Sequence, residues 1–383
     1  MEIELKNLKG TRDYLPEEQK LRNKIRDTLE KVFLSYGYRP LETPMLCLME
    51  ILASKYGGGA EILKEVYRLK DQGGRELALR YDLTVPFARV IGMNPNLRLP
   101  FKRYEIGRVF RDGPIKTGRL REFIQCDVDI AGVKSTMAEA ELMALSFDVF
   151  TELGLDIYIS YNNRKFLIGA LESIGISEEQ ISETVLTLDK VEKIGKDGVR
   201  DELKTQGVKE DFIEEIFKIF QKGRRPEEYL PASDNALLRE GKDELKELES
   251  YLESLGLMEK SDFNPLLARG LEIYTGTVFE IFLSDKAMTS SIAGGGRYDN
   301  IIGSFIGNGE EYPAVGISFG LDVIYTVLTM ESDKNTPEPA LVDLLLIPLG
   351  TEKETMHIAQ NLRKTGVNIE VDMSRKRLKR SLD

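Results

Sequence analysis

Residues 101–132 read FKRYEIGRVFRDGPIKTGRLREFIQCDVDIAG, and this stretch decides the fold because it has the pattern of a β-hairpin. Residues 103–111 and 122–130 each alternate apolar with polar or small side chains, as strands with one buried face do. Gly113, Pro114 and Gly118 lie between the two segments and mark a turn. We therefore expect two paired strands joined by a basic loop.

The returning segment of this hairpin places three polar side chains on one face. Gln125, Asp127 and Asp129 lie on that face, and apolar residues occupy the alternate positions. Burying two acids is costly unless a cationic or hydrogen-bonding group is bound against them. The face therefore predicts a binding site, and the alternative is an edge hairpin whose charges are solvated.

Composition excludes several classes of protein. The chain of 383 residues is long enough for two or three domains. Its 53 basic and 64 acidic residues give a net charge of −11, so any RNA contact must use local basic patches. Cys47 and Cys126 cannot form a disulfide framework, and the single histidine, His357, leaves no metal-ligand spacing. Because the N-terminus is charged and no apolar run approaches ~18 residues, we expect a cytoplasmic protein without a membrane span.

The segments before the hairpin read as a helix and a short strand. Apolar residues recur every three or four positions over residues 21–36, and Gly37 closes this amphipathic pattern. A short strand interrupted by Pro40 and Pro44 follows. Residues 57–59 are three glycines, which suit either a plain loop or a lid.

A second strand, over residues 77–81, leads to a polar break that holds Asp82 and Thr84 and then to a helix that starts near Pro86. These two side chains suit the capping of that helix.

Beyond the hairpin, the periodicity changes twice. Residues 137–153 predict a helix and residues 156–161 a strand, after which helices dominate up to residue 257. Strand patterns resume over residues 264–282, and residues 314–328 read as a strand followed by a helix. Residues 294–296 are three glycines, which favour either the floor of a flat pocket or a tight bend.

Several motifs resemble those of class II aminoacyl-tRNA synthetases, and most closely the histidyl-tRNA synthetases. The hairpin resembles the second class II motif, with Phe110-Arg111 ending one strand and GRLREF and QCDVD following. The sequence RGLEIYTGT, residues 269–277, resembles a signature of the histidine-specific branch. Residues 21–44 resemble the first motif, which builds the dimer interface in the family, and residues 314–328 resemble the third.

The resemblance implies an α+β fold: a class II synthetase core of mixed, mostly antiparallel sheet flanked by helices. It implies a core made of residues 1–164 and 258–332, a helical insertion at 165–257, a linker at 333–340 and a partial α/β domain at 341–383. That last part resembles about half of the family's anticodon-binding domain, so we expect a C-terminally shortened chain.

The resemblance also implies the chemistry of a histidine–tRNA ligase. Histidine would react with ATP, with Mg²⁺ bridging phosphate oxygens, to give histidyl-adenylate, and tRNA(His) would then accept the histidyl group. A homodimer is implied in the same way, and no protein ligand of the metal can be assigned.

Family roles carry over onto matching residues of this chain. Arg111 and Arg269 would be catalytic and contact both the α-phosphate and the substrate carboxylate. The remaining expected histidine-binding residues are Asp82, Thr84 and Gln125 at the α-amino group, Asp129 and Tyr274 at the ring nitrogens, and Ile273 and Tyr298 in the same site. The expected ATP-binding residues are Arg111, Asp112 and Arg119.

The chain departs from the family pattern at a few positions. Val323 stands where most class II enzymes carry an arginine directed at ATP, and Gly113 stands where an acid is usual, with Asp112 adjacent. Ile273 replaces a usual tyrosine. An alternative function is therefore a histidine-binding regulatory relative of the ATP phosphoribosyltransferase regulatory subunit type, which does not charge tRNA. Val323 and the short C-terminal part favour it, whereas Arg269 favours the ligase.

Overall fold

The structure, a computed structural model, describes residues 4–53, 61–115, 118–221, 223–268, 273–307, 310–331 and 342–374. The chain divides into two compact units, one of Met1–Tyr14 with Gln19–Thr329 and one of Leu15–Glu18 with Met330–Asp383. The domain boundaries expected from the sequence stay predictions. Gly57–Gly59, Arg269 and the linker at 333–340 lie outside the described residues.

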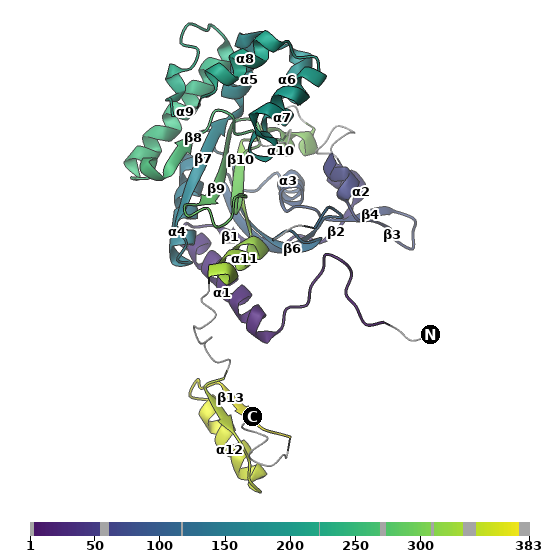
Figure 1. The fold of residues 1–383 in the computed structure, drawn as a ribbon. Helices are drawn as coiled ribbons and strands as arrows, with labels where there is room; N and C mark the ends of the chain where they lie inside the picture. Colours follow the sequence, from purple (N-terminus) through teal and green to yellow (C-terminus); the bar gives the residue numbers. More distant parts are fainter. Residues whose placement is uncertain are drawn as a thin grey trace. The chain divides into compact units, whose positions relative to one another are not determined.

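The predicted hairpin is present as β5 (Phe101–Phe110) and β6 (Glu122–Ala131), which pair antiparallel. They lie in a sheet of order β1-β5-β6-β11-β10-β9-β7-β8 (Figure 1). The other members are β1 (Arg39–Pro40), β7 (Ile157–Asn163), β8 (Ser261–Phe263), β9 (Thr277–Leu283), β10 (Ala293–Arg297) and β11 (Ala314–Gly320). Only the pairs β1/β5 and β7/β8 are parallel within this sheet, which confirms the expected mixed, mostly antiparallel arrangement.

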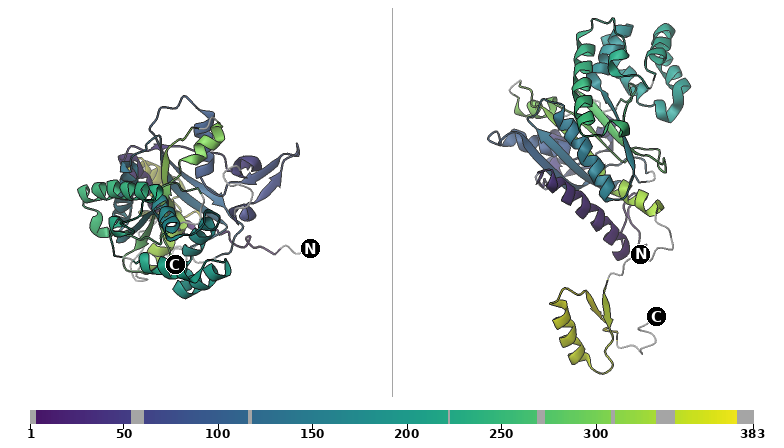
Figure 2. Two further views of the ribbon diagram at one scale, coloured as in Figure 1. Left: turned by 90° about the horizontal axis from the view of Figure 1, so that it is seen from above. Right: turned by 90° about the vertical axis from the view of Figure 1, so that its left-hand side faces the viewer.

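Two long helices cover one face of this sheet (Figure 2). They are α1 (Pro16–Ser35), which confirms the helix predicted over residues 21–36, and α4 (Met137–Glu152). The ring of Phe319 on β11 lies 5.7 Å from Phe33 of α1 and 5.8 Å from Phe150 of α4, centroid to centroid. Cys126, Val128 and Ile130 of β6 belong to the same buried cluster, so the alternate residues of β6 face the other side of the sheet.

The opposite face carries a smaller group of elements. These are α2 (Met49–Ala53), η1 (Glu61–Glu65), α3 (Thr84–Met93), α10 (Asn300–Ile306) and a three-stranded sheet of β2 (Leu46–Leu48), β4 (Glu76–Leu79) and β3 (Arg68–Lys70). A second hydrophobic cluster joins α3 and α10 to Leu52, Ala78 and Ile273. The polar break after β4 is thereby held against the sheet at the start of α3.

Helices follow β7, as the sequence predicts. They are α5 (Arg164–Ile174), α6 (Glu178–Leu188), α7 (Val191–Thr205), α8 (Glu210–Ile219) and α9 (Ala236–Ser254), with short turns η2 (Pro226–Glu228) and η3 (Met258–Lys260). Helices α5 and α9 cross closely because each places a glycine at the contact. A Cβ added to Gly169 would lie 2.3 Å from the backbone nitrogen of Leu238, and one on Gly241 would lie 2.2 Å from that of Phe166.

The strand-to-helix unit near the end of the core is β11 followed by α11 (Leu321–Glu331), as predicted. The second unit contains β12 (Leu344–Leu346), α12 (Glu352–Arg363) and β13 (Ile369–Val371), and its two strands pair in parallel. No helix among the described residues combines the length and the apolar character needed to cross a membrane.

One alternative left open by the sequence is resolved by the fold. The glycines at 294–296 form part of strand β10 in the middle of the large sheet, so the tight-bend interpretation is wrong. A Cβ on Gly295 would lie 2.0 Å from the carbonyl oxygen of Gly316, which is why these strands need small residues.

Candidate active site

The register of the sheet aligns the polar face of β6 with small residues on the neighbouring strands. Asp127 lies opposite Glu105 of β5 on one side and Ser318 of β11 on the other, and Ser318 lies opposite Gly294 of β10. Two residues farther along β6, Asp129 lies between Arg103 of β5 and Gly316 of β11 in the same way. Glycines and a serine beside the acids leave room above the sheet.

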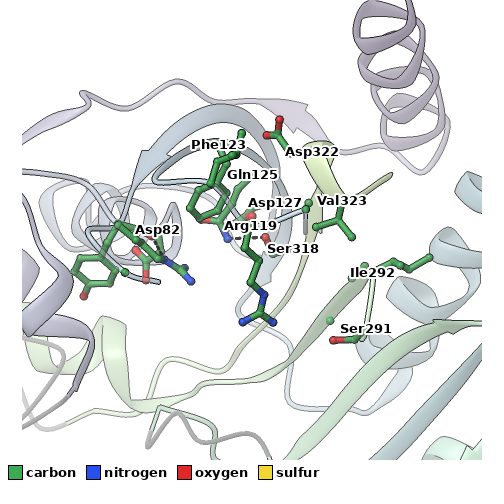
Figure 3. A pocket seen from close by; sticks show the side chains of 18 of the residues that line it. Asp82, Arg119, Phe123, Gln125, Asp127, Ser291, Ile292, Ser318, Asp322 and Val323 are labelled. Carbon is green, nitrogen blue, oxygen red and sulfur yellow. Dashed lines mark hydrogen bonds between the residues drawn. The ribbon is translucent and has the colours of Figure 1, made fainter. Parts of the chain in front are cut away.

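That room is a pocket of about 390 Å³. Its lining includes Asp82, Thr84, Arg111, Arg119, Phe123, Gln125, Asp127, Ile273, Tyr274, Gly294, Ser318, Asp322 and Val323 (Figure 3). A smaller slot of about 40 Å³ continues the pocket, because both are lined by Thr84, Asp127, Ile273, Tyr274, Gly294 and Ser318. Asp129 and Tyr298 line only the slot.

Below the pocket, two arginines of the sheet region are fully buried and paired with acids. Arg80 Nη1 lies 2.7 Å from Glu105 Oε1, and Arg103 Nη2 lies 2.7 Å from Asp129 Oδ2. The hydroxyl of Tyr298 donates to Asp129 Oδ1. Burial raises the pKa of the Asp129 carboxyl, and the charge of Arg103 partly offsets this effect.

Asp127 differs from its neighbours because it is buried without such a partner. Asp127 is 3% exposed, and its Oδ1 atom has no hydrogen-bond partner. No arginine or lysine of the described residues forms an ion pair with it. Burial raises its pKa to about 7, the charge of Arg103 opposes the rise, and the nearby Asp129 adds to it.

Ser318 links Asp127 to Gln125. Its hydroxyl oxygen accepts a hydrogen bond from Gln125 Nε2 at 2.8 Å, and it hydrogen-bonds the Asp127 carboxylate. The three side chains lie close together in Figure 3. Gln125 Oε1 is buried and has no hydrogen-bond partner.

The two residues of the polar break both line the pocket. Asp82 Oδ1 accepts a hydrogen bond from the backbone nitrogen of Val85 at 3.1 Å, so Asp82 stabilises the first turn of α3. This hydrogen bond anchors the Asp82 carboxylate at the start of α3, beside the pocket.

Basic side chains gather at the other end of the pocket. Arg111 Nε donates to the carbonyl oxygen of Tyr81 at 3.0 Å, and its guanidinium carbon lies 5.3 Å from the centroid of the Phe123 ring. Arg119 is exposed and extends across the open part of the pocket (Figure 3). This end therefore combines two positive charges with an aromatic face.

The start of the chain supports this basic end from outside. The carbonyl oxygen of Gly10 accepts from the backbone nitrogen of Arg121 at 2.8 Å, and Arg22 of α1 forms a buried ion pair with Asp322. Asp322 also accepts from the Tyr14 hydroxyl at 2.7 Å. Val323, the next residue, is half-buried in the pocket wall.

Most residues predicted from the sequence come together here. Those lining the pocket or the slot are Asp82, Thr84, Arg111, Arg119, Gln125, Asp129, Ile273, Tyr274 and Tyr298. Asp112 is not among the lining residues, and its carboxylate lies 3.0 Å from Arg121 Nη1. Arg269 lies outside the described residues, so its role stays a prediction.

Sequence reasoning did not assign site roles to Phe123, Asp127 or Ser318. The alternation of β6 placed Asp127 on the polar face, which was the available signal for it. Ser318 carried no local signal, because only the pairing of β11 with β6 brings it beside Asp127.

Comparison with known proteins gives a consistent result. Residues 10–324 match the family described as histidyl-tRNA synthetase. The chain is 57% identical to Histidine–tRNA ligase 1 of Bacillus cereus, covering 100% of this chain and 89% of that protein. It is 51% identical to Histidine–tRNA ligase 2 of Shouchella clausii, covering 98% of this chain and 89% of that protein.

Solved structures agree on the fold. Histidyl-tRNA synthetase from Nostoc sp. PCC 7120 superposes with a TM-score of 0.84 at 30% identity, covering 100% of this chain and 89% of that chain. A protein from Bacillus halodurans C described as an ATP phosphoribosyltransferase regulatory subunit/histidyl-tRNA synthetase gives 0.83 at 21% identity, covering 100% and 96%. At that identity the second similarity concerns the fold alone.

Proposed function

The chain belongs to the histidyl-tRNA synthetase family, and on this premise we propose how its pocket performs the histidine–tRNA ligase reaction. In that reaction a carboxylate oxygen of L-histidine attacks the α-phosphorus of ATP, and the bond to the departing pyrophosphate breaks. The terminal hydroxyl of tRNA(His) then attacks the carbonyl carbon of histidyl-adenylate, and AMP leaves. The observation that carries the assignment is one pocket with buried acceptors at one end and arginines at the other.

Histidine occupies the end built on the sheet. Asp82, Thr84 and Gln125 bind its α-amino group, because an ammonium group offers three donors and these side chains offer oxygen acceptors. The ring enters the slot, where Asp129 and Tyr274 hydrogen-bond its two nitrogens. Tyr298 and Ile273 line the same slot. A slot that hydrogen-bonds both ring nitrogens rejects side chains without them by about 10⁴-fold.

ATP occupies the basic end. Arg111 is held by the Tyr81 carbonyl so that its guanidinium faces the pocket, where it stabilises the negative charge that develops at the α-phosphate. Arg269 shares this role, by resemblance to the family. Arg119 contacts the terminal phosphates, and Asp112 acts indirectly by pairing with Arg121.

Mg²⁺ fits this end as an ion that arrives with ATP. No group of three or more His, Cys, Asp or Glu residues within the described ranges could hold a metal ion by itself. Mg²⁺ is commonly bound by one or two carboxylates together with phosphate oxygens, and Glu65 lines the pocket as such a carboxylate. When bound, the ion would neutralise phosphate charge.

The regulatory alternative is not favoured. The relatives that match 100% and 98% of this chain, at 57% and 51% identity, are both ligases by name. We propose that the chain works as a homodimer in the cytoplasm, in keeping with its family, and that tRNA(His) is its acceptor.

Histidine-dependent exchange of pyrophosphate into ATP tests the assignment directly. We expect exchange with L-histidine and Mg·ATP, and we expect Arg111→Ala to lower its rate by about 10²- to 10³-fold, because it removes one donor to the developing charge. The matched control is Arg108→Ala on the same strand, whose side chain is 61% exposed and pairs with Glu122. Absence of exchange in the unmodified protein at saturating histidine would instead support the regulatory alternative.

A further inference from the structure

The buried acids of the site outnumber the arginines that neutralise them. Arg80 pairs with Glu105 and Arg103 with Asp129, as described above. Farther away, Asp322 pairs with Arg22 and Glu139 with Arg297. Asp127 is just as buried but belongs to no ion pair among the described residues, although a buried carboxylate without a cation is strongly disfavoured.

The hydrogen bonds around Ser318 determine which atoms remain available. A serine hydroxyl has one proton, and Ser318 uses it toward the Asp127 carboxylate, which cannot donate when ionised. Ser318 must therefore accept from the NH₂ group of Gln125, as the 2.8 Å contact shows. This orientation turns Gln125 Oε1 away from Ser318. Gln125 Oε1 and Asp127 Oδ1 are then buried acceptors without a hydrogen bond or an ion pair on the same face of β6, whereas Asp129 Oδ2, which also lacks a hydrogen bond, lies 2.7 Å from Arg103 Nη2.

From these contacts we infer that Asp127 is a further substrate-binding residue, whose unpartnered oxygen accepts a hydrogen bond from the α-ammonium group of histidine. The inference rests on the proposed function in taking histidine as the substrate. Gln125 Oε1 lacks a hydrogen-bond donor, and Asp127 lacks a positively charged partner. An ammonium group supplies both. A neutral ring N–H would supply only the donor.

The position of Asp127 suits this assignment. Asp127 and Thr84 line both the pocket and the slot, so they stand where the α-carbon of a ligand would lie if its ring entered the slot. Asp129, one residue pair farther along β6, has the charge of Arg103 beside it at 2.7 Å and accepts a hydrogen bond from the Tyr298 hydroxyl. Among the described residues, Asp127 is thus the acid of this face that has no ion pair of its own, and a positively charged group of the substrate would supply one.

The inference implies that binding depends on pH. The groups that face Asp127 are Arg103 and Glu105 on β5, Asp129 on β6, Ser318 on β11, Asp82 before α3 and Tyr298 after β10. With a pKa of about 7, Asp127 is largely protonated at pH 6 and largely ionised at pH 8. Affinity for an ammonium ligand should therefore rise between these values, and binding should release a proton at the lower one.

Calorimetric titration of the full chain without ATP or tRNA tests the inference with three probes. Histidine and histidinol carry the amino group, whereas imidazolepropionate lacks it. We expect Asp127→Asn to weaken histidine and histidinol by roughly 10- to 100-fold at pH 8, because a charge-assisted hydrogen bond is lost, and to leave imidazolepropionate unchanged. The ratio of the two proteins' affinities for histidinol should shrink toward pH 6, and titration of the ligand's own ring cancels in that ratio.

Controls separate this role from a general structural one. Glu122→Gln lies on the same strand and should change none of the three affinities, while Ser318→Ala should weaken the two amino-group ligands through Gln125 and Asp127. Retained binding of ATP by Asp127→Asn would show that the variant is folded. Equal losses for all three probes, or an affinity ratio that does not vary with pH, would overturn the inference. A protein that binds histidine but shows no pyrophosphate exchange would contradict the proposed function and leave this inference standing.

Discussion

The two ends of the pocket are built in different ways. At the end that receives the amino acid, the charged groups sit on paired strands and are buried, and glycines on β10 and β11 make the space. At the end that receives the nucleotide, the charges lie on the connection between β5 and β6, and Arg119 is exposed. The difference suggests that packing arranges the first end before substrate arrives, whereas the phosphates themselves help to order the second.

The strongest test of that contrast removes a buried guanidinium. Arg103→Ala should lower the free energy of unfolding by about 3–5 kcal/mol, because Asp129 would stay buried without its cation. Arg108→Ala removes another arginine of β5 that pairs with an acid of β6, but at an exposed site, and should cost about 0.2–1 kcal/mol. Urea denaturation of both variants measures the two costs. Equal costs would mean that burial does not make the paired charges of the sheet more important for stability than exposed ones.

A smaller effect should appear in the pH dependence of stability. The pKa of Asp127, about 7 in the folded protein, lies above the ~3.9 of an unfolded aspartate, so the folded state retains a proton that the unfolded state has released. Stability from this group is therefore lost as pH rises from about 4 to 7 and changes little above 7.

Asp127→Asn removes this dependence. Relative to the unmodified protein without ligand, its free energy of unfolding should gain roughly 2–3 kcal/mol between pH 5 and pH 7, at about 1.4 kcal/mol per pH unit. Denaturant titrations at pH 5, 6, 7 and 8 measure the difference. If the difference in free energy of unfolding stayed constant from pH 5 to pH 8, the pKa of Asp127 in the folded protein would not be near 7.

The smallest effect concerns Val323, at the nucleotide end. Val323→Ala trims an apolar wall and should cost about 1 kcal/mol of ATP binding, which corresponds to roughly a fivefold rise in the KM for ATP. The affinity for histidine should not change, because Val323 does not line the slot. A comparable loss of histidine affinity would show that the two ends are coupled.

Local patterns in the sequence predicted the hairpin, the helix α1 and the polar face of β6, because each depends on the spacing of neighbouring residues. They did not predict which strand lies on the other side of β6. The pairing of β6 with β11 joins segments more than a hundred residues apart along the chain. It alone brings Ser318 next to Asp127, with Gly294 of β10 on the far side of Ser318. The glycines of β10 left a bend open as an alternative for the same reason, since their tight neighbours belong to another strand.

The placement of single side chains was predictable only in part. Asp82 and Thr84 were expected at a strand end, and they line the pocket while Asp82 also caps α3. Asp112 was expected to bind ATP by resemblance to the family, and this role stays a prediction; its carboxylate lies 3.0 Å from Arg121 Nη1. The direction of a side chain in a loop depends on such contacts, which spacing along the sequence does not encode.

The contacts of the N-terminal segment have a practical consequence. Gly10 and Tyr14 line no part of the pocket, yet they hold Arg121 and Asp322, which flank the end that receives the nucleotide. Trimming the first fourteen residues, or fusing a bulky tag close to them, would therefore disturb turnover with ATP before it disturbed recognition of the amino acid. Preparations of this enzyme that differ only at their beginnings should not be assumed to be kinetically equivalent.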